Sequence, residues 1–283
     1  MTISKTSFKE YSFAHHGAVY AILEKVFATY GIPYYLIGAN ARDVHLYQQG
    51  IRPNRGTADI DFAVMVPDFD TYKAIFEALS NLGFKPTKEP YRLVYNATNT
   101  VLDLMPYGEI AQEYTVNFTE RNLELSVLGL KEVGAFTQQI SIPEEGYTLP
   151  VSPIEGIFIL KLVAWQDKPT IRTKDLEDIS FLLQHAWDLY EEEAYSEHPD
   201  IFEDENFDTQ TAAAKVIGKK MGLILVTNKT LCQVVTGILE NISTEDEIAK
   251  NPEITVAQSL NITLEKAKSI LNYILEGIYI TSK

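Results

Sequence analysis

Two aspartates, Asp59 and Asp61, open a β-prone run that continues to Val66 and stops at Pro67. Residues two apart on a strand share one face, so both carboxylates would project together, with their backbones about 6 to 7 Å apart. Such a pair suits Mg²⁺, which binds one or two carboxylates together with phosphate oxygens of a substrate. An Asp-x-Asp also occurs as a solvated edge of a sheet, so the pair alone leaves both interpretations open.

A turn upstream of this pair could hold phosphate. The run Tyr34–Ile37 is strand-like, and the segment after Gly38-Ala39 can be helical as far as Gln48. Free backbone N–H groups at a helix start bind phosphate, and a glycine lets the phosphate approach the backbone closely. A plain strand-to-helix turn is the alternative.

A third acid, Asp103, stands inside the apolar run Val101–Met105, which a turn-like segment follows. A lone acid in such a strand should have a partner or a metal, because an unpaired buried charge is costly. If the strands are neighbours, Asp59, Asp61 and Asp103 form a triad. A triad can hold two ions that stabilise the attacking and leaving oxygens of phosphoryl transfer.

The elements that must position these residues change in character along the chain. Strand-like runs, including Tyr91–Asn96, alternate with helical segments up to about residue 150, and helical periodicity dominates after Pro153. We therefore expect an α/β domain over 1–150 and a helical domain over 151–283, with an acidic linker at about 191–208.

Composition narrows the function classes. The 283 residues carry a net charge of −15, and the stretch from Trp187 to Asp208 contains no Lys or Arg. An acidic chain is a poor candidate for binding long nucleic acid, which needs a basic face. The stretch from Gly38 to Gly56, by contrast, is locally basic, with Arg42, Arg52 and Arg55 against Asp43.

A cytoplasmic location is expected. The single cysteine excludes an internal disulfide, and no basic and apolar leader or long apolar span is evident.

Together the motifs resemble the nucleotidyltransferase fold of the DNA polymerase β superfamily, and more closely the bacterial nucleotidyltransferases grouped with the AbiEii/AbiGii toxins. The segments that carry the resemblance are Leu36-Ile-Gly-Ala-Asn-Ala-Arg-Asp43, Arg55-Gly-Thr-Ala-Asp-Ile-Asp-Phe-Ala-Val64, Leu102-Asp-Leu-Met-Pro-Tyr-Gly108, Leu160-Lys-Leu-Val-Ala-Trp-Gln-Asp-Lys168 and Lys174-Asp-Leu-Glu-Asp-Ile179. The resemblance implies an α+β fold, in which helices flank a mixed sheet and a mostly helical C-terminal domain follows.

The resemblance also implies roles for single residues. Asp59 and Asp61 would bind the metals that hold the triphosphate, and Asp103 would complete the metal site and help to deprotonate the acceptor hydroxyl. Gly38 would let the triphosphate lie against the turn. The family often has Ser or Gly next, where this chain has Ala39, so a phosphate-binding hydroxyl is absent and Asn40 could take its place.

Further nucleotide contacts are expected from basic residues. Arg42 and Arg55 are candidates for the triphosphate, because guanidinium groups match phosphate geometry; an ion pair with Asp43 is the alternative for Arg42. Lys161, on an apolar helix face, would contact phosphate or remain a structural lysine. Asp175 shares a helix face with Asp178 and could position Lys161, or merely cap the helix.

The resulting hypothesis is a nucleotidyltransferase that uses two Mg²⁺ ions, or Mn²⁺, to move NMP from an NTP to an acceptor hydroxyl. The acceptor is an RNA end, a protein or a small molecule. Two alternatives remain open: a protein that binds nucleotide without turnover, or a component of a toxin–antitoxin pair that acts by binding a cognate antitoxin.

Overall fold

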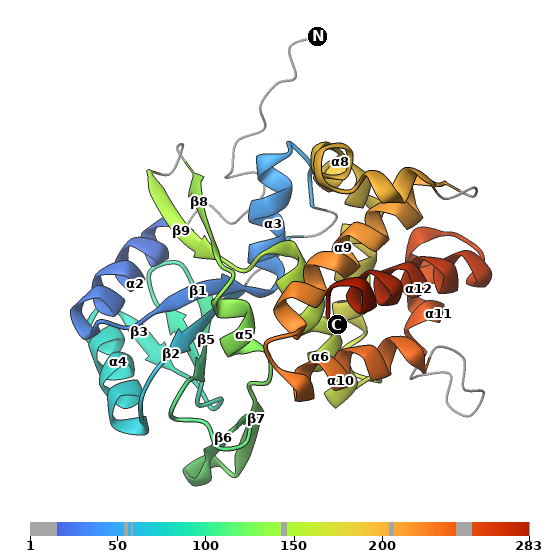
Figure 1. Ribbon diagram of the computed structural model, residues 1–283. Helices are drawn as coiled ribbons and strands as arrows, with labels where there is room; N and C mark the ends of the chain where they lie inside the picture. Colours follow the sequence, from blue (N-terminus) through green and yellow to red (C-terminus); the bar gives the residue numbers. More distant parts are fainter. Residues whose placement is uncertain are drawn as a thin grey trace. The chain divides into compact units, whose positions relative to one another are not determined.

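The computed structural model describes residues 16–53, 56–57, 59–142, 146–203, 207–241 and 251–282 (Figure 1). The chain divides into two compact units, Met1–Pro153 and Ile154–Lys283. The first unit contains, in chain order, α2 (His16–Tyr30), β1 (Tyr34–Ile37), α3 (Gly38–Gln48), β2 (Asp59–Met65), α4 (Phe69–Asn81), β3 (Phe84–Pro86), β4 (Arg92–Tyr95), β5 (Thr100–Tyr107), β6 (Thr115–Phe118), η1 (Thr119–Arg121), β7 (Leu123–Ser126), α5 (Leu130–Gly134), β8 (Gln138–Ile142) and β9 (Tyr147–Val151).

Within the described residues, seven strands form one mixed sheet in the order β3-β4-β5-β2-β1-β9-β8. Strand β2 lies at its centre, parallel to β5 on one side and antiparallel to β1 on the other. Strands β6 and β7 form a separate hairpin. A mixed sheet with flanking helices, followed by a helical unit, confirms the predicted α+β class.

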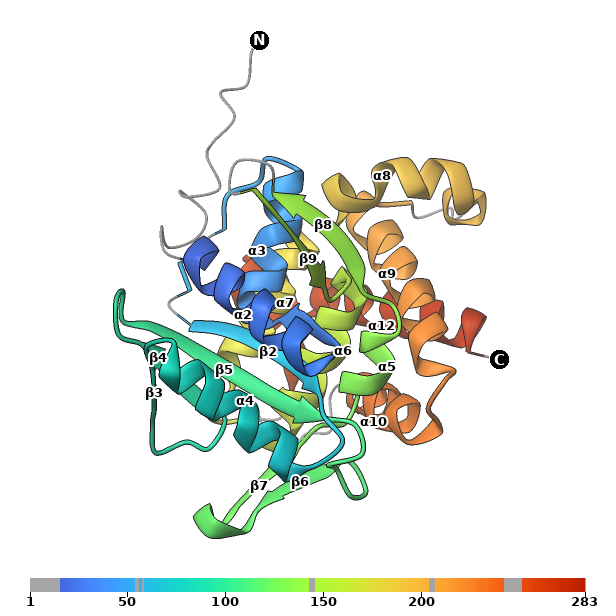
Figure 2. The ribbon, with the colours of Figure 1, turned by 90° about the vertical axis from the view of Figure 1, so that its left-hand side faces the viewer.

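Helices α2 and α4 lie side by side on one face of the sheet (Figure 2). The ring of Phe62 on β2 packs edge-on against Tyr20 and Phe27 of α2, with centroids 5.8 and 6.3 Å apart. On α4, the Tyr72 hydroxyl donates to the carbonyl of Leu104 on β5. Because side chains alternate along a strand, Asp59 and Asp61 must project from the opposite face. Helix α5 lies on that second face, where its Leu130 carbonyl accepts from the Tyr35 hydroxyl.

The second unit is helical. It contains α6 (Ile154–Asp167), α7 (Thr173–Gln184), α8 (Ala186–Glu197), η2 (Pro199–Glu203), α9 (Thr209–Leu225), α10 (Lys229–Glu240), α11 (Pro252–Leu260) and α12 (Leu264–Thr281). Helices α9 and α12 touch along their backbones, because glycines stand where they cross. A Cβ on Gly218 would lie 2.0 Å from the Ile274 carbonyl oxygen, and one on Gly277 would lie 2.3 Å from the Lys215 carbonyl oxygen. Among the helices described, none combines the length and the apolar character needed to cross a membrane.

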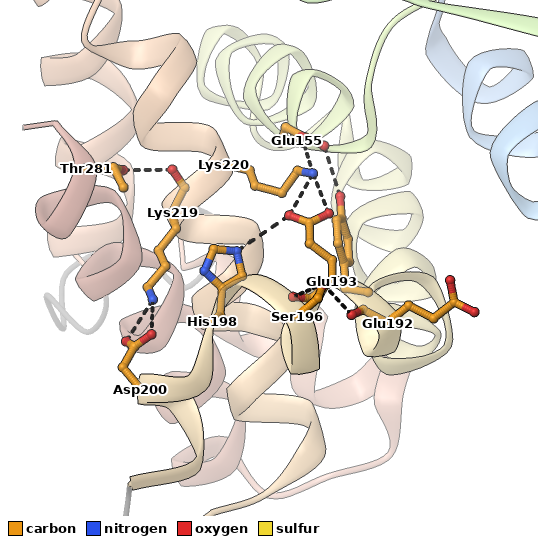
Figure 3. A network of polar contacts seen from close by, with 10 residues as sticks. Glu155, Glu192, Glu193, Ser196, His198, Asp200, Lys219, Lys220 and Thr281 are labelled. Carbon is orange, nitrogen blue, oxygen red and sulfur yellow. Dashed lines mark hydrogen bonds and ion pairs between the residues drawn. The ribbon is translucent and has the colours of Figure 1, made fainter.

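The sequence predicted an acidic linker at about 191–208, and this prediction is wrong for most of that segment. Helix α8 extends through Glu197, and η2 follows as far as Glu203; residues 204–206 lie outside the described part. Two acids of this segment, Glu193 and Asp200, pair with lysines of α9 (Figure 3). Lys220 Nζ lies 2.7 Å from a Glu193 carboxylate oxygen, and Lys219 Nζ lies 2.7 Å from both oxygens of Asp200.

The same network reaches the interior of the helical unit (Figure 3). The Lys220 ammonium also lies 3.5 Å from Glu155 on α6, and the Tyr190 hydroxyl of α8 donates to Glu155 over 2.9 Å. Glu155 and Tyr190 are buried. Burial and the neighbouring Glu155 carboxylate raise the pKa of Tyr190 well above its ordinary value, so its hydroxyl stays protonated and donates. These contacts join α6, α8 and α9.

Candidate active site

The aspartate pair occupies the start of the central strand. Asp59 and Asp61 share the face of β2 that α2 and α4 leave uncovered. In the sheet register Asp61 stands between Ile37 of β1 and Asp103 of β5. Neighbouring strands lie about 4.8 Å apart, so Asp61 and Asp103 bring two carboxylates together on that face. The three predicted acids therefore lie on one face of two paired strands, Asp59 and Asp61 on β2 and Asp103 on β5.

Gly38 supports the pair from the first helical position of α3. Its φ of +69° belongs to the left-handed region, which glycine enters without a steric penalty. A Cβ at this position would lie 2.4 Å from Oδ2 of Asp61. The absence of a side chain at Gly38 therefore lets the Asp61 carboxylate lie against the turn between β1 and α3.

The next two residues, Ala39 and Asn40, continue the turn into α3. Ala39 is half-buried and brings no polar side chain to the turn. Asn40 is buried, and its Nδ2 donates to the backbone carbonyl of Asp59 over 2.6 Å. This hydrogen bond fastens α3 to the first residue of β2 and so positions Asp59. The role of Asn40 in place of a phosphate-binding hydroxyl stays a prediction.

The third acid, Asp103, is held by Arg92 of β4. Arg92 Nε and one terminal nitrogen, Nη2, each donate to a different oxygen of Asp103 over 2.7 Å, forming a bidentate pair. The same Nη2 lies 3.9 Å from Oδ2 of Asp59. The Arg92 side chain is 33% exposed, whereas that of Asp103 is only 8% exposed.

Burial is the largest influence on the Asp103 carboxyl and raises its pKa above the ordinary value, although the Arg92 guanidinium acts in the opposite direction. The hydrogen bonds to Asp103 raise the pKa of Arg92 beyond any physiological range. Arg92 is therefore a permanent cation beside a buried carboxylate.

Sequence reasoning missed Arg92. A signal was present, because the runs Tyr91–Asn96 and Val101–Met105 and the turn between them predict a hairpin. The observed register of that hairpin sets Arg92 directly opposite Asp103, and residues directly opposite on paired strands share a face.

The two arginines that were expected to contact phosphate, Arg42 and Arg55, have different outcomes. Arg42 is fully buried, and its Nε donates to Oδ1 of Asp43 over 2.8 Å. The structure therefore places Arg42 in the ion pair that was its alternative, and a phosphate contact would require this buried pair to open. Arg55 lies outside the described residues.

Lys161 belongs to an ion-pair cluster within the helical unit. Its ammonium lies 2.7 Å from Asp178 and 3.1 Å from Asp175, both on α7. Arg172 adds a second cation, because its Nε lies 2.7 Å from the other oxygen of Asp175. Lys161 and Asp178 are buried. The expectation that the two aspartates position Lys161 agrees with this geometry.

The acids on β2 and β5 fit a hard cation in their chemistry. Carboxylate oxygens are the ligands that Mg²⁺ prefers, and one or two carboxylates are enough when substrate phosphates supply the rest. In the part of the chain that the structure describes, however, no three acidic, histidine or cysteine side chains converge as a complete metal site. Both oxygens of Asp103 accept instead from the Arg92 guanidinium.

A family model matches a large part of the chain. Residues 46–213, more than half of the chain, match the family model described as "Nucleotidyl transferase AbiEii toxin, Type IV TA system". The chain belongs to the AbiEii family. The AbiEii match includes Asp59, Asp61 and Asp103, as well as Lys161 with its two aspartates; it begins after the Gly38 turn and ends within α9.

No curated protein matches this AbiEii chain. Among solved structures, it is similar to one described as "tRNA-processing enzyme (apo form 2)", with 13% sequence identity and a TM-score of 0.26. That similarity covers 92% of this chain and 80% of the other.

Proposed function

We propose that this AbiEii protein transfers the NMP part of an NTP to an acceptor hydroxyl in a metal-dependent reaction that releases pyrophosphate. One observation carries the proposal. Asp59 and Asp61 share a face at the start of the central strand, where Asp61 lies beside a glycine turn and in register with Asp103. Membership of a nucleotidyltransferase family supports the reaction class.

Each residue of the proposed site has a defined task. Asp59 and Asp61 would hold Mg²⁺, or Mn²⁺, together with the triphosphate. Two such ions supply, when bound, the positive charge that stabilises the attacking and leaving oxygens of phosphoryl transfer. Asp103 would contribute a third carboxylate, as a metal ligand or as the acceptor of the hydroxyl proton. Asn40 and Gly38 keep the first two acids in place, Asn40 through the Asp59 carbonyl and Gly38 by leaving room for Asp61.

The acceptor and the partner are also part of the proposal. The net charge of −15 disfavours a long nucleic acid and leaves an RNA end, a protein side chain or a small molecule. The family description names a toxin of a toxin–antitoxin system, which supports a cognate antitoxin as the functional partner. A contact between Lys161 and the nucleotide phosphates remains a prediction.

The test is Mg²⁺-dependent binding of each of the four NTPs to the wild type and to the Asp59→Asn/Asp61→Asn variant. We expect binding that requires both the metal and the carboxylates. Asp70→Asn, which removes an exposed carboxylate on α4, is the matched control and should bind as the wild type does.

A transfer assay then addresses turnover. NTP labelled at the α-phosphate is incubated with total cellular RNA, total protein or small-molecule extract. Label that becomes covalently attached to one of these fractions identifies the acceptor class. If no NTP binds, or the double variant binds equally well, nucleotidyl transfer at this site is refuted. Binding without label transfer would indicate a nucleotide-binding protein without turnover.

A further inference from the structure

The guanidinium of Arg92 lies between two acids of the proposed site, Asp103 and Asp59. It donates to both oxygens of Asp103 over 2.7 Å and has Oδ2 of Asp59 at 3.9 Å. It therefore contacts carboxylates of two neighbouring strands, β5 and β2, from a third strand, β4. A cation in this place stabilises the ionised form of Asp103, because that carboxyl is almost fully buried and an unpaired buried charge is strongly destabilising.

The arginine is built into the sheet and is not a chance surface contact. Backbone hydrogen bonds fix β4 on both sides, and the register places Arg92 opposite Asp103. Its planar fork matches both carboxylate oxygens at once, which a lysine could not do. At the same time the Arg92 side chain is one-third exposed, so it can swing toward solvent without disturbing a packed core.

We propose that Arg92 acts as a resident counter-ion of the metal-free site, and that Asp103 becomes available to a divalent cation only when the Arg92 fork releases it. Arg92 is thus a positioning residue that sets the metal affinity of the triad. Two ligand states of Asp103 follow: a closed state in which Arg92 binds both oxygens, and an open state in which they face Asp61. The inference rests on the proposed function, because it assumes that the acids bind metal.

Charge and geometry both support the competition. Arg92 neutralises the charge of Asp103 in the metal-free site. A metal ion that binds through Asp103 must replace the two charge-assisted hydrogen bonds from Arg92. It must also overcome the electrostatic repulsion of the guanidinium. Removing the guanidinium lifts both obstacles. The Asp103 carboxylate then has no cation beside it, so bound metal should raise the free energy of unfolding of the variant.

The test is Mn²⁺ binding to the full chain without nucleotide, measured by electron paramagnetic resonance of the free ion. We expect Arg92→Gln to bind Mn²⁺ more tightly than the wild type by roughly tenfold, the equivalent of one charged hydrogen bond. Arg92→Lys keeps the charge and loses the fork, so its affinity should be intermediate. Adding Asp103→Asn to Arg92→Gln should abolish the gain. Arg121→Gln removes the charge of an exposed arginine in the same unit and should change nothing.

Nuclear magnetic resonance of the arginine side chains provides a second readout on the wild type, which does not depend on how a variant folds. The Nε–H signal of Arg92, assigned by its loss in Arg92→Lys, should be protected without metal and lose that protection when Mg²⁺ is added. The inference is overturned if Arg92→Gln binds Mn²⁺ no more tightly than the wild type, or if Mg²⁺ leaves the Arg92 signal unchanged. Failure of the proposed function looks different: neither the wild type nor Arg92→Gln would bind Mn²⁺ through Asp59 and Asp61.

Discussion

Replacement of Gly38 by alanine separates a backbone effect from a site effect. The chain offers a matched control, because Gly50 has the same φ of +69° and nothing within 4 Å of the position where its Cβ would lie. Forcing a non-glycine residue into the left-handed region costs about 1–2 kcal/mol. Gly38→Ala and Gly50→Ala should therefore both lower the free energy of unfolding by about that amount.

Only Gly38→Ala adds a second effect. Its Cβ would lie 2.4 Å from Oδ2 of Asp61, where ordinary contact begins at 3.4 Å. The carboxylate must therefore retreat by about 1 Å, several times the tolerance of roughly 0.2 Å for a metal–ligand distance. We expect Gly38→Ala to weaken Mn²⁺ binding by about tenfold or more, an affinity loss of about 1.4 kcal/mol.

Urea unfolding and Mn²⁺ titration of the two alanine variants, each against the wild type, give the measurement. The expected pattern is an equal loss of stability in both and a loss of metal affinity in Gly38→Ala alone. If Gly38→Ala binds Mn²⁺ as tightly as Gly50→Ala does, the Asp61 carboxylate is not a metal ligand held by this turn, and the reasoning fails.

Two further predictions concern the helical unit. Lys161→Met should lower the free energy of unfolding by about 3–5 kcal/mol, because it removes the cation from buried carboxylates; Lys168→Met, at a 60% exposed side chain, should change it by less than about 0.5 kcal/mol. Urea unfolding compares the two, and equal effects would contradict the buried cluster. Gly218→Ala should destabilise by about 1–3 kcal/mol or more, because its Cβ would meet the backbone of α12. Gly237→Ala, in open space on α10, should instead stabilise by up to about 1 kcal/mol, and thermal unfolding that ranks them in the opposite order would refute the close crossing.

Local patterns were enough to predict the centre of the site. The two-residue spacing of Asp59 and Asp61 fixes their common face whatever the strand pairs with. Gly38 stands between a strand pattern and a helix pattern, so the turn at this position was predictable. The hairpin that contains Asp103 was also predictable, because two β-prone runs flank a short turn.

Pairing and burial were not readable from the chain. Arg92 contacts Asp103 only through the register of β4 on β5, which a shift of one residue would reverse. The burial of Asn40 and Arg42, and their contacts with the Asp59 carbonyl and the Asp43 carboxylate, could not be predicted from the residue types. The acidic stretch looked like a linker because its cations, Lys219 and Lys220, come later in the sequence, on α9.

The crossing of α9 and α12 has a practical consequence for anyone who divides this chain. The family match ends at residue 213, yet the glycine contacts that join α9 to α12 begin at Gly218 and reach Gly277. The match also begins at residue 46, beyond β1, the antiparallel neighbour of the strand that carries the acids. A fragment cut at those limits would expose the edge of β2 and, because it lacks most of α9, the surfaces of α6 and α8 that α9 covers. Both favour aggregation. The segment that defines the family by sequence is therefore smaller than the segment that must fold together.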